Sequence, residues 1–281
     1  MINKYILKLR SLNKSYEIDG YIIPKNDAYF SEFSYPDRLK KISNFTGSAG
    51  YAIILKTKNY LFVDGRYTIQ AKIESGKNFK IIQIPNKSPK DILKGKMRKI
   101  TLGFDPQLFT SFSLKKKIGN LVFLKPIKEN LIDKLFREDK NIPVNKFYAL
   151  NPRIVGESFK SKINRLIIEL SLRKIDNIFI SAPENVAWLL NIRGGDSPNS
   201  PVPNSRLIIS KSKKILLIST INKCQKLISK KIIKKNQFLD INKFSKEILK
   251  LNGKNFVVDD KSCSIFHESL IKSKFKIISR E

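Results

Sequence analysis

The spacing of apolar and polar positions changes between helical and β-strand periodicity along the chain, and the same order of these periodicities occurs twice. In the first half, apolar residues at helical spacing are followed by short β-rich runs that glycine and asparagine turns separate. The elements predicted there are a helix over 4–16, a strand over 21–23, a long loop over 24–50, a hairpin of 51–55 with 60–63, a helix over 67–74, a strand over 100–104, a helix over 111–118 and a strand over 121–124.

The second half repeats this order. Its predicted elements are a helix over 159–172, a strand over 177–180, a loop through 191–195, a hairpin of 206–209 with 215–218, a helix over 243–250, a strand over 255–258, a helix over 264–271 and a strand over 275–278. Strands that alternate with helices predict an α/β fold, here two domains that are each a mixed β-sheet flanked by helices. The predicted boundaries are 1–128 and 153–281, with a proline-marked linker over 129–152.

The net charge of +31 raises the possibility of a polyanionic partner. Lysines outnumber arginines four to one and are spread along the chain, whereas proteins that read bases and phosphates favour the forked guanidinium of arginine. The densest clusters, 115–117 and 223–235, are interpreted as solvated helix faces. The prediction is therefore no nucleic-acid partner, with a basic nucleic-acid binder as an alternative that salt-sensitive retention of DNA or RNA would reveal.

The two cysteines, Cys224 and Cys263, show no CxxC pattern, which indicates a reducing compartment and predicts a cytoplasmic location. The longest uncharged stretch, 42–55, is too short and too polar to span a bilayer. Charged residues also interrupt the apolar positions at the amino terminus, unlike the apolar core of a signal peptide. No membrane association is expected.

Two motifs occupy corresponding corners of the two halves. The first half contains Gly47-Ser48-Ala49-Gly50 and, after the hairpin, Asp64-Gly65-Arg66-Tyr67. The second half contains Ala187-Trp188-Leu189-Leu190-Asn191-Ile192-Arg193-Gly194, followed by Asp196. In this order, over nearly the whole chain, the motifs resemble the two amino-terminal creatinase-like domains, I and II, of Xaa-Pro aminopeptidases of the three-domain type.

The resemblance implies a metallopeptidase that removes the residue before a proline from peptides with proline at the second position. In that family a carboxy-terminal pita-bread domain holds two divalent metals, commonly manganese, through two Asp, one His and two Glu, and a bridging water attacks the peptide bond. No segment of this chain resembles that domain, so the parent protein is expected to be the enzyme and these 281 residues alone to be inactive. The family further implies a homodimer or larger assembly, in which the two leading domains shape access to the active site and help hold the subunits together.

No metal or cofactor is expected in this chain, because its one histidine, His267, provides no imidazole cluster. His267 is predicted to be a surface or half-buried helix residue. The Gly47–Gly50 segment opens a hairpin and lacks a Gly-Lys-Ser/Thr ending, which favours a structural turn over a phosphate-binding loop. Ser48 has no nearby histidine to activate it as a nucleophile. Asp64 and Arg66 are interpreted as a helix cap and a local ion pair.

The residues Trp188, Asn191, Arg193 and Asp196 are the candidates for contact with substrate. A Gly-Gly loop that carries a fixed cation could face a substrate carboxylate or a partner surface. Arg193 is therefore placed near the peptide-binding cleft of the assembled enzyme, while Trp188, among apolar neighbours, is expected in the core.

One alternative of another class stays open, an inactive creatinase-like module that binds peptides or a protein partner by itself. The coding sequence separates the two hypotheses. A reading frame that continues past Glu281 into a histidine- and carboxylate-bearing domain favours the enzyme, and a stop codon favours the module.

Overall fold

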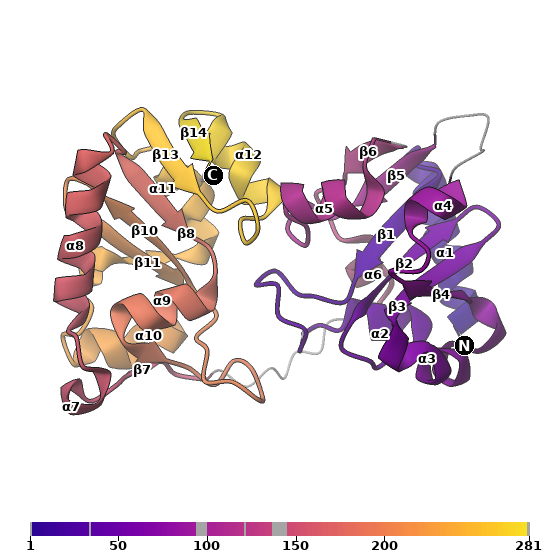
Figure 1. Cartoon of the computed structure of the whole chain (residues 1–281), viewed down its shortest axis with the longest axis horizontal. Coiled ribbons are helices and arrows are strands. Elements are labelled where there is room, and N and C mark those ends of the chain that lie inside the picture. The colour runs from indigo at the N-terminus through magenta and orange to yellow at the C-terminus, as the bar shows by residue number, and fades with distance from the viewer. Residues whose placement is uncertain (1, 34, 94–99, 121, 137–144, 280–281) are drawn as a thin grey trace. The chain divides into compact units, whose positions relative to one another are not determined.

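In the computed structural model, the described residues are 2–33, 35–93, 100–120, 122–136 and 145–279. The chain divides into two compact units, Met1–Lys140 and Asn141–Glu281, and each contains its own six-stranded sheet (Figure 1). The predicted α/β fold of two mixed sheets flanked by helices is confirmed.

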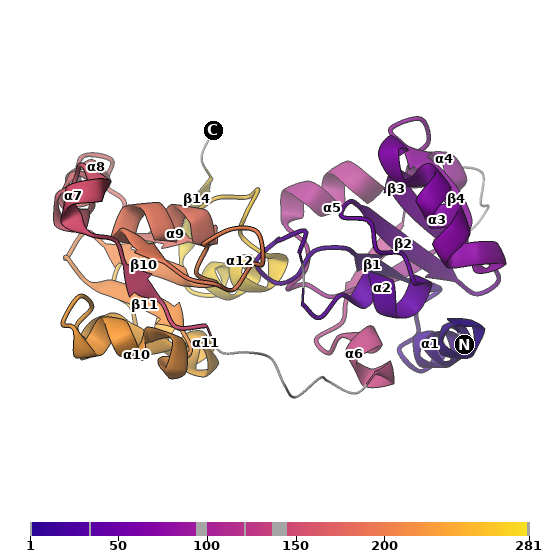
Figure 2. The same cartoon turned by 90° about the horizontal axis from the view of Figure 1, so that it is seen from below.

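The first unit is a mixed sheet between two layers of helices. Its helices are α1 (Ile2–Ser15), α2 (Arg38–Ser43), α3 (Thr68–Ser75), α4 (Pro89–Leu93), α5 (Ser111–Ile118) and α6 (Leu131–Leu135), with 3-10 turns at Gly65–Tyr67 and Gly76–Asn78. Its strands are β1 (Gly20–Pro24), β2 (Gly50–Leu55), β3 (Asn59–Asp64), β4 (Lys80–Ile84), β5 (Thr101–Phe104) and β6 (Phe123–Pro126). The strand order is β4-β3-β2-β1-β5-β6, in which β1, β2 and β3 are antiparallel neighbours and the other pairs are parallel. Figure 2 shows α1, α2 and α6 on one side of this sheet and α5 on the other.

The second unit has the same construction. Its helices are α7 (Pro152–Val155), α8 (Phe159–Leu172), α9 (Pro183–Leu190), α10 (Ile221–Ser229), α11 (Phe244–Ile248) and α12 (Ile265–Lys272), with 3-10 turns at Lys235–Gln237 and Ile241–Lys243. Its main strands are β8 (Asn177–Ile180), β10 (Arg206–Ser210), β11 (Ile215–Ser219), β12 (Phe238–Asp240), β13 (Asn255–Val258) and β14 (Lys276–Ser279). A separate antiparallel pair joins β7 (Tyr148–Ala149) to β9 (Ile192–Arg193).

The two sheets are topological copies of each other. The order β12-β11-β10-β8-β13-β14 repeats that of the first unit, with the same directions in every pair. In register, Tyr21 of β1 pairs with Gly103, and Ile178 of β8 pairs with Val257. Tyr21 and Ile178 are therefore equivalent positions, and the repeated order of elements predicted from the sequence is confirmed.

The equivalence extends into the first helix of each unit. The N–H of Ile18 donates to the carbonyl of Asn13, and the N–H of Ile175 donates to the carbonyl of Leu170. Both strands therefore follow their helices through the same turn, which aligns α1 with α8 residue by residue. Ile6 and Ile163, which are equivalent in this alignment, are both buried.

Several elements differ from the sequence prediction. The loop predicted over 24–50 contains α2, the unpredicted helix α9 ends just before the loop predicted through 191–195, and the structure adds the edge strands β4 and β12. The helix α2 has only two apolar residues among charged ones, and β12 is three residues long, so neither has a strong period. The strand predicted over 121–124 is β6, two residues further on, and Leu121 lies outside the described residues.

Each unit buries its own core. In the first unit the residues of α6, Leu131 and Ile132, pack with Ile6, Leu9 and Tyr21. The segment 129–152, expected as a linker, thus begins with residues buried in the first unit, while Phe147 packs in the second. Residues 137–144 of that segment lie outside the described part of the chain.

Candidate functional site

Asn191 fixes the corner of the second unit at the carboxyl end of α9. It adopts a left-handed conformation with φ 54°, which ends the helix. Its side chain is buried: Oδ1 accepts a hydrogen bond from Lys162 Nζ at 2.8 Å, and Nδ2 donates to the carbonyl of Glu157 at 2.9 Å. The corner is therefore tied to α8 and to the turn before it.

Arg193, the cation of this corner, contacts the end of α9. Its Nη1 donates to the carbonyl of Ala187 at 3.2 Å and to that of Ile192 at 2.9 Å. A cation at the carboxyl end of a helix interacts favourably with the negative end of the helix dipole. The residue is half-buried.

Trp188 is exposed, which corrects the prediction that it lies in the core. Its exposed fraction is 56%, while Val186, Leu189 and Leu190 form the buried face of α9. The run of apolar residues is longer than the arc of a helix that can face the sheet, so one large side chain points outward. The ammonium of Lys162 lies 4.2 Å from the centroid of the indole.

Asp196 anchors the loop that follows the corner. Its Oδ2 accepts a hydrogen bond from the N–H of Asn204 at 2.7 Å, and its Oδ1 forms an ion pair with Lys223 Nζ at 2.6 Å. Lys223 belongs to the lysine cluster that the sequence places on a solvated helix face, yet its side chain is largely buried here. Gly194 is confined as well, because a Cβ atom there would lie 2.9 Å from the ring of Phe147 and from Pro203.

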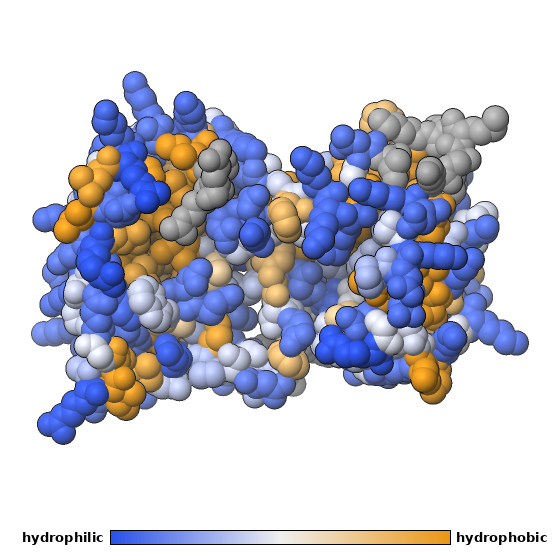
Figure 3. Space-filling model, in the orientation of Figure 1, coloured by the Kyte–Doolittle hydropathy of each residue, from blue (hydrophilic) through white to orange (hydrophobic). Residues whose placement is uncertain are grey.

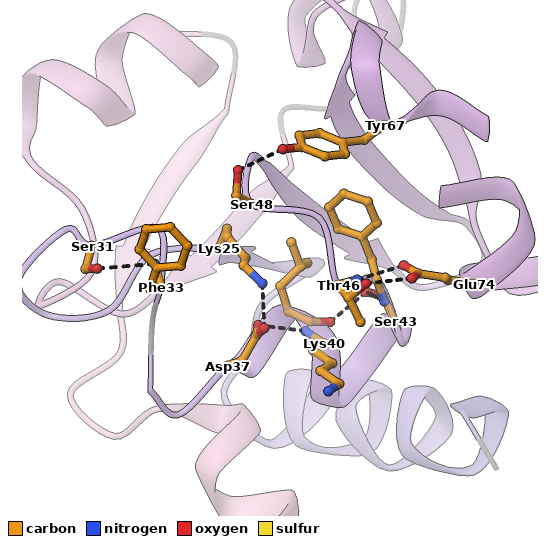
Figure 4. Close-up of polar contacts among 12 residues, drawn as sticks. Lys25, Ser31, Phe33, Asp37, Lys40, Ser43, Thr46, Ser48, Tyr67 and Glu74 are labelled. Atoms are coloured by element: carbon orange, nitrogen blue, oxygen red, sulfur yellow. Dashed lines mark hydrogen bonds and ion pairs between the residues drawn. The ribbon is translucent and has the colours of Figure 1, made fainter. Parts of the chain in front are cut away.

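The corner of the first unit is built in the same way (Figure 4). The helix α2 ends at Asn44, again left-handed with φ 64°, and the buried Phe45 follows. A Cβ atom on Gly47 would meet the rings of Phe45 at 2.3 Å and Tyr67 at 2.9 Å. The hydroxyls of Ser48 and Tyr67 point toward each other at 2.9 Å. Ser48 is thus held by a tyrosine in a turn that leads, through Gly50, into β2.

Thr46 and Lys25 secure the two sides of this corner in Figure 4. Thr46 donates from its N–H and its hydroxyl to the carboxylate of Glu74, at 2.7 and 2.6 Å. Burial raises the pKa of Glu74, but the hydrogen bonds from Thr46 and Gln70 outweigh it and hold the pKa below its ordinary value. Lys25 pairs with Asp37, whose other oxygen caps α2. These contacts fix the backbone of the corner.

Asp64 and Arg66 form the cap and ion pair that their spacing predicts. Asp64 Oδ1 accepts from the N–H of Arg66 at 3.0 Å and from its Nε at 2.9 Å. The element they cap is the 3-10 turn Gly65–Tyr67, and α3 begins one residue later. Both side chains are exposed, so the pair adds little stability.

The two corners correspond residue by residue. Asn44 and Asn191 have the same left-handed conformation, and each precedes a fully buried apolar residue and then, two positions on, a glycine without room for a side chain. The shared Asn-x-x-Gly spacing was a sequence signal for this match. Lys162 gave no such signal, because a lysine in an amphipathic helix is ordinarily solvated.

His267 is buried, which corrects its prediction as a surface or half-buried residue. It lies among the rings of Phe179, Phe244 and Phe266, and its Nδ1 is 2.6 Å from Ser264 Oγ. Burial, followed by the charge of Arg206, lowers the pKa of His267 well below its ordinary value. The side chain was misjudged because the helical period does not show that α11 covers it.

Within the ranges that the structure describes, no three His, Cys, Asp or Glu side chains come together as a metal site would require. No helix in the same ranges is long and apolar enough to cross a membrane.

Comparisons with known proteins give one consistent result. Residues 6–135 and 138–281 each match the profile of a family described as the Creatinase/Prolidase N-terminal domain. A probable Xaa-Pro aminopeptidase P of Laccaria bicolor is 34% identical over 229 residues, which are 76% of this chain and 35% of that protein. A probable Xaa-Pro aminopeptidase P of Aspergillus fumigatus is 33% identical over 230 residues, with the same coverage. The matched part of the chain thus spans about a third of the length of these relatives.

The crystal structure of an X-prolyl aminopeptidase from Caenorhabditis elegans, described as a cytosolic enzyme with a di-nuclear active site, shares the fold. It superposes with a TM-score of 0.84 at 22% identity, over 100% of this chain and 50% of that one.

Proposed function

Because the chain belongs to the creatinase/prolidase amino-terminal domain family, with one such domain in each unit, we propose that it is the non-catalytic amino-terminal part of an Xaa-Pro aminopeptidase. In this role its two domains shape access to the active site and contribute to a homodimer, in the cytosol. The substrates are peptides with proline at the second position.

The observation that carries the proposal is the tandem arrangement itself. Two copies of one topology follow each other, and the curated relatives that align with 76% of the chain are named as Xaa-Pro aminopeptidases. The motif corners lie at the same end of each sheet, where the central strand β1 or β8 ends.

The described residues of this chain do not fit a pair of manganese ions. The sequence has one histidine, and its ring is enclosed by phenylalanines and hydrogen-bonded to Ser264. The described carboxylates and thiols form no group of three with one another or with it. The metal pair is accordingly proposed to lie in another domain of the longer protein, and no catalytic step is assigned to residues of this chain.

We assign Trp188, Asn191, Arg193 and Asp196 to the edge of the peptide-binding cleft in the assembled enzyme. Asn191 and Asp196 are held by Lys162 and Lys223, contacts that fix the two ends of the corner without any substrate and would favour a preorganised loop. Arg193 is only half-buried, and its described hydrogen bonds use Nη1 alone; a guanidinium suits the carboxylate of a short peptide.

Activity separates this proposal from a stand-alone module. The purified 281-residue chain should release no amino acid from a peptide of sequence Arg-Pro-Pro with Mn²⁺ present, whereas the longer polypeptide should cleave it. Manganese-dependent cleavage by the 281 residues, or none by the longer protein, would refute the proposal.

The cleft assignment is tested in the longer polypeptide. Arg193→Ala should raise KM for tripeptides and leave kcat unchanged, and Arg193→Lys should recover part of the loss. Arg66→Ala, which removes an exposed arginine from the first unit, is the matched control. Equal effects of the Arg193 and Arg66 variants would remove Arg193 from the cleft.

A further inference from the structure

A hollow of about 640 Å³ lies on one face of the second sheet, between α8, α9 and the ends of β8 and β13. Its floor is aliphatic and includes Leu166, Ile178, Ile180 of β8 and Val257 of β13. Figure 3 shows apolar side chains gathered in this region and bordered by hydrophilic ones. An apolar floor open to solvent requires an explanation.

The same place in the first unit is filled by α6. Leu131 and Ile132 of α6 are fully buried, and they cover Leu9, Tyr21 and Ile23, whose exposures are 0%, 1% and 1%. The equivalent residues of the second unit, in the same order, are Leu166, Ile178 and Ile180, and all three are only half-buried. The second unit therefore has the same surface that α6 covers in the first unit, here called the seat, and none of its described residues covers it.

The polar contacts at the start of α6 also have counterparts. Asn130 caps α6, and its Nδ2 donates to Asp105 Oδ2 at 2.8 Å. Asp105 and Asp259 are equivalent, since each follows the parallel neighbour of the central strand and accepts from the N–H two residues later. Asp105 is buried beneath α6, whereas Asp259 is exposed and lines the hollow.

Asp133 of α6 forms a bidentate pair with Arg38 of α2, at 2.9 Å to Nε and 2.7 Å to Nη2. Alignment of α2 with α9 through their left-handed asparagine caps places Asn185 at the position of Arg38. Asn185 also lines the hollow.

At the end of α6, the ring of Phe136 stacks on Tyr5 at 4.2 Å and lies 5.9 Å from the ammonium of Lys41. Lys162 is the equivalent of Tyr5, and Trp188 is the equivalent of Lys41. The aromatic ring thus lies on the first helix of the pair in the first unit and on the second helix in the second unit, and the cation does the reverse. Lys162 and Trp188 both line the hollow. The side chains that contact Asn130, Asp133 and Phe136 in the first unit thus each have an equivalent residue that lines the hollow of the second unit.

We propose that this hollow is the seat of an amphipathic helix of the same polypeptide, which follows β14 as α6 follows β6. The inference rests on the proposed function, in which the chain is part of a longer protein, as its relatives are about three times its matched length. The helix begins with a polar cap near Asp259, places two adjacent apolar side chains on Ile178 and Ile180, and ends beside Trp188. Because Lys162 replaces Tyr5, its last turn carries a polar or small residue in place of Phe136.

Trp188 is the only tryptophan of the chain, so its fluorescence reports on the seat directly. The test extends the 281-residue chain by a copy of residues 129–136 that carries Phe136→Ala. The copy stands in register, because Ser279 ends β14 as Pro126 ends β6. The emission of Trp188 should shift to the blue and its acrylamide quenching constant should fall by about half, since the exposed ring becomes covered.

The matched control is the same extension with the Leu131 and Ile132 positions both changed to serine. This control should leave the quenching constant of the 281-residue chain unchanged. Equal quenching of the two extended chains, with matching circular dichroism, would overturn the proposal, as would a blue shift that grows with protein concentration and so indicates a helix from a second copy. If an extended chain aggregates, the two extension sequences can be added to the 281-residue chain as separate peptides at millimolar concentration, and they provide the same comparison. No readout here depends on peptidase activity, so failure of the proposed function leaves this test intact.

Discussion

Asp19 and Asp176 hold the same place in the two units. The N–H of Asp19 donates to the carbonyl of Thr101, whose own N–H donates back to the carboxylate of Asp19 at 2.8 Å. Asp176 exchanges the same two bonds with Asn255, at 3.1 and 2.9 Å. Each aspartate therefore joins the start of the central strand to the start of its parallel neighbour.

Asp176→Asn should destabilise the second unit by about 1–3 kcal/mol at neutral pH, because the charged acceptor of several N–H groups is lost. The backbone hydrogen bond from Asn255, followed by the side-chain hydrogen bond from Lys211, lowers the pKa of Asp176 to about 2. This folded pKa lies below that of the unfolded chain, so the stabilisation is complete above about pH 4 and is lost as the pH falls toward 2. Urea unfolding followed by Trp188 fluorescence measures both effects. The exposed Asp260→Asn is the control, and an equal acid sensitivity of the two variants would contradict the assignment.

Asn13→Leu should stabilise the first unit by about 1–3 kcal/mol, because a buried amide without partners costs roughly that amount. The side chain is 3% exposed, and neither of its polar atoms has a hydrogen-bond partner within the described structure. The equivalent residue of the second unit is Leu170, which is also buried, so the fold accommodates leucine at this place. Thermal unfolding by circular dichroism should show a higher Tm for Asn13→Leu and a lower one for Asn13→Asp. A lower Tm for the leucine variant would show that the amide has a structural role.

The stability of the second unit should decline as the pH falls below about 6.5, the ordinary pKa of histidine. His267 is neutral in the fold because burial lowers its pKa, so the unfolded chain takes up a proton that the folded chain does not. The stabilisation is present above the unfolded pKa and is lost as the pH falls toward the folded one. In the His267→Asn variant, the urea midpoint of unfolding should change less between pH 7 and 5 than in the parent chain. Asp176 stays ionised throughout this range. An unchanged pH dependence in this variant would show that another group titrates.

Gly47→Ala should destabilise the first unit by about 1–3 kcal/mol, because the added methyl group has no room between Phe45 and Tyr67. Gly65→Ala in the neighbouring motif is the control, since the nearest atoms there belong to the flexible end of Gln83. The difference in urea midpoint between the two variants measures the cost of the steric clash of the added methyl group with Phe45 and Tyr67. Equal midpoints would mean that the rings move aside without cost.

The fold could be predicted where the sequence has long or regular periods. The bounds 159–172 and 177–180 were predicted as the structure has them, since α8 alternates a full apolar stripe with charges and β8 follows an Asp turn. The short helices α2 and α9 were missed. Their ends depend on asparagines in a left-handed conformation, and a sequence does not display that conformation.

The sequence by itself determined the order of the longer elements, the repeat and the family, because these depend on local periods and on motifs that lie within a few residues of one another. Only the tertiary structure decided which faces are covered. Trp188 is exposed, His267 is buried and Lys162 is enclosed by α9 because segments far away in the sequence either cover these side chains or do not. Burial is a property of the assembled neighbours, so the empty seat beside α8 became visible only when the two folded units were compared.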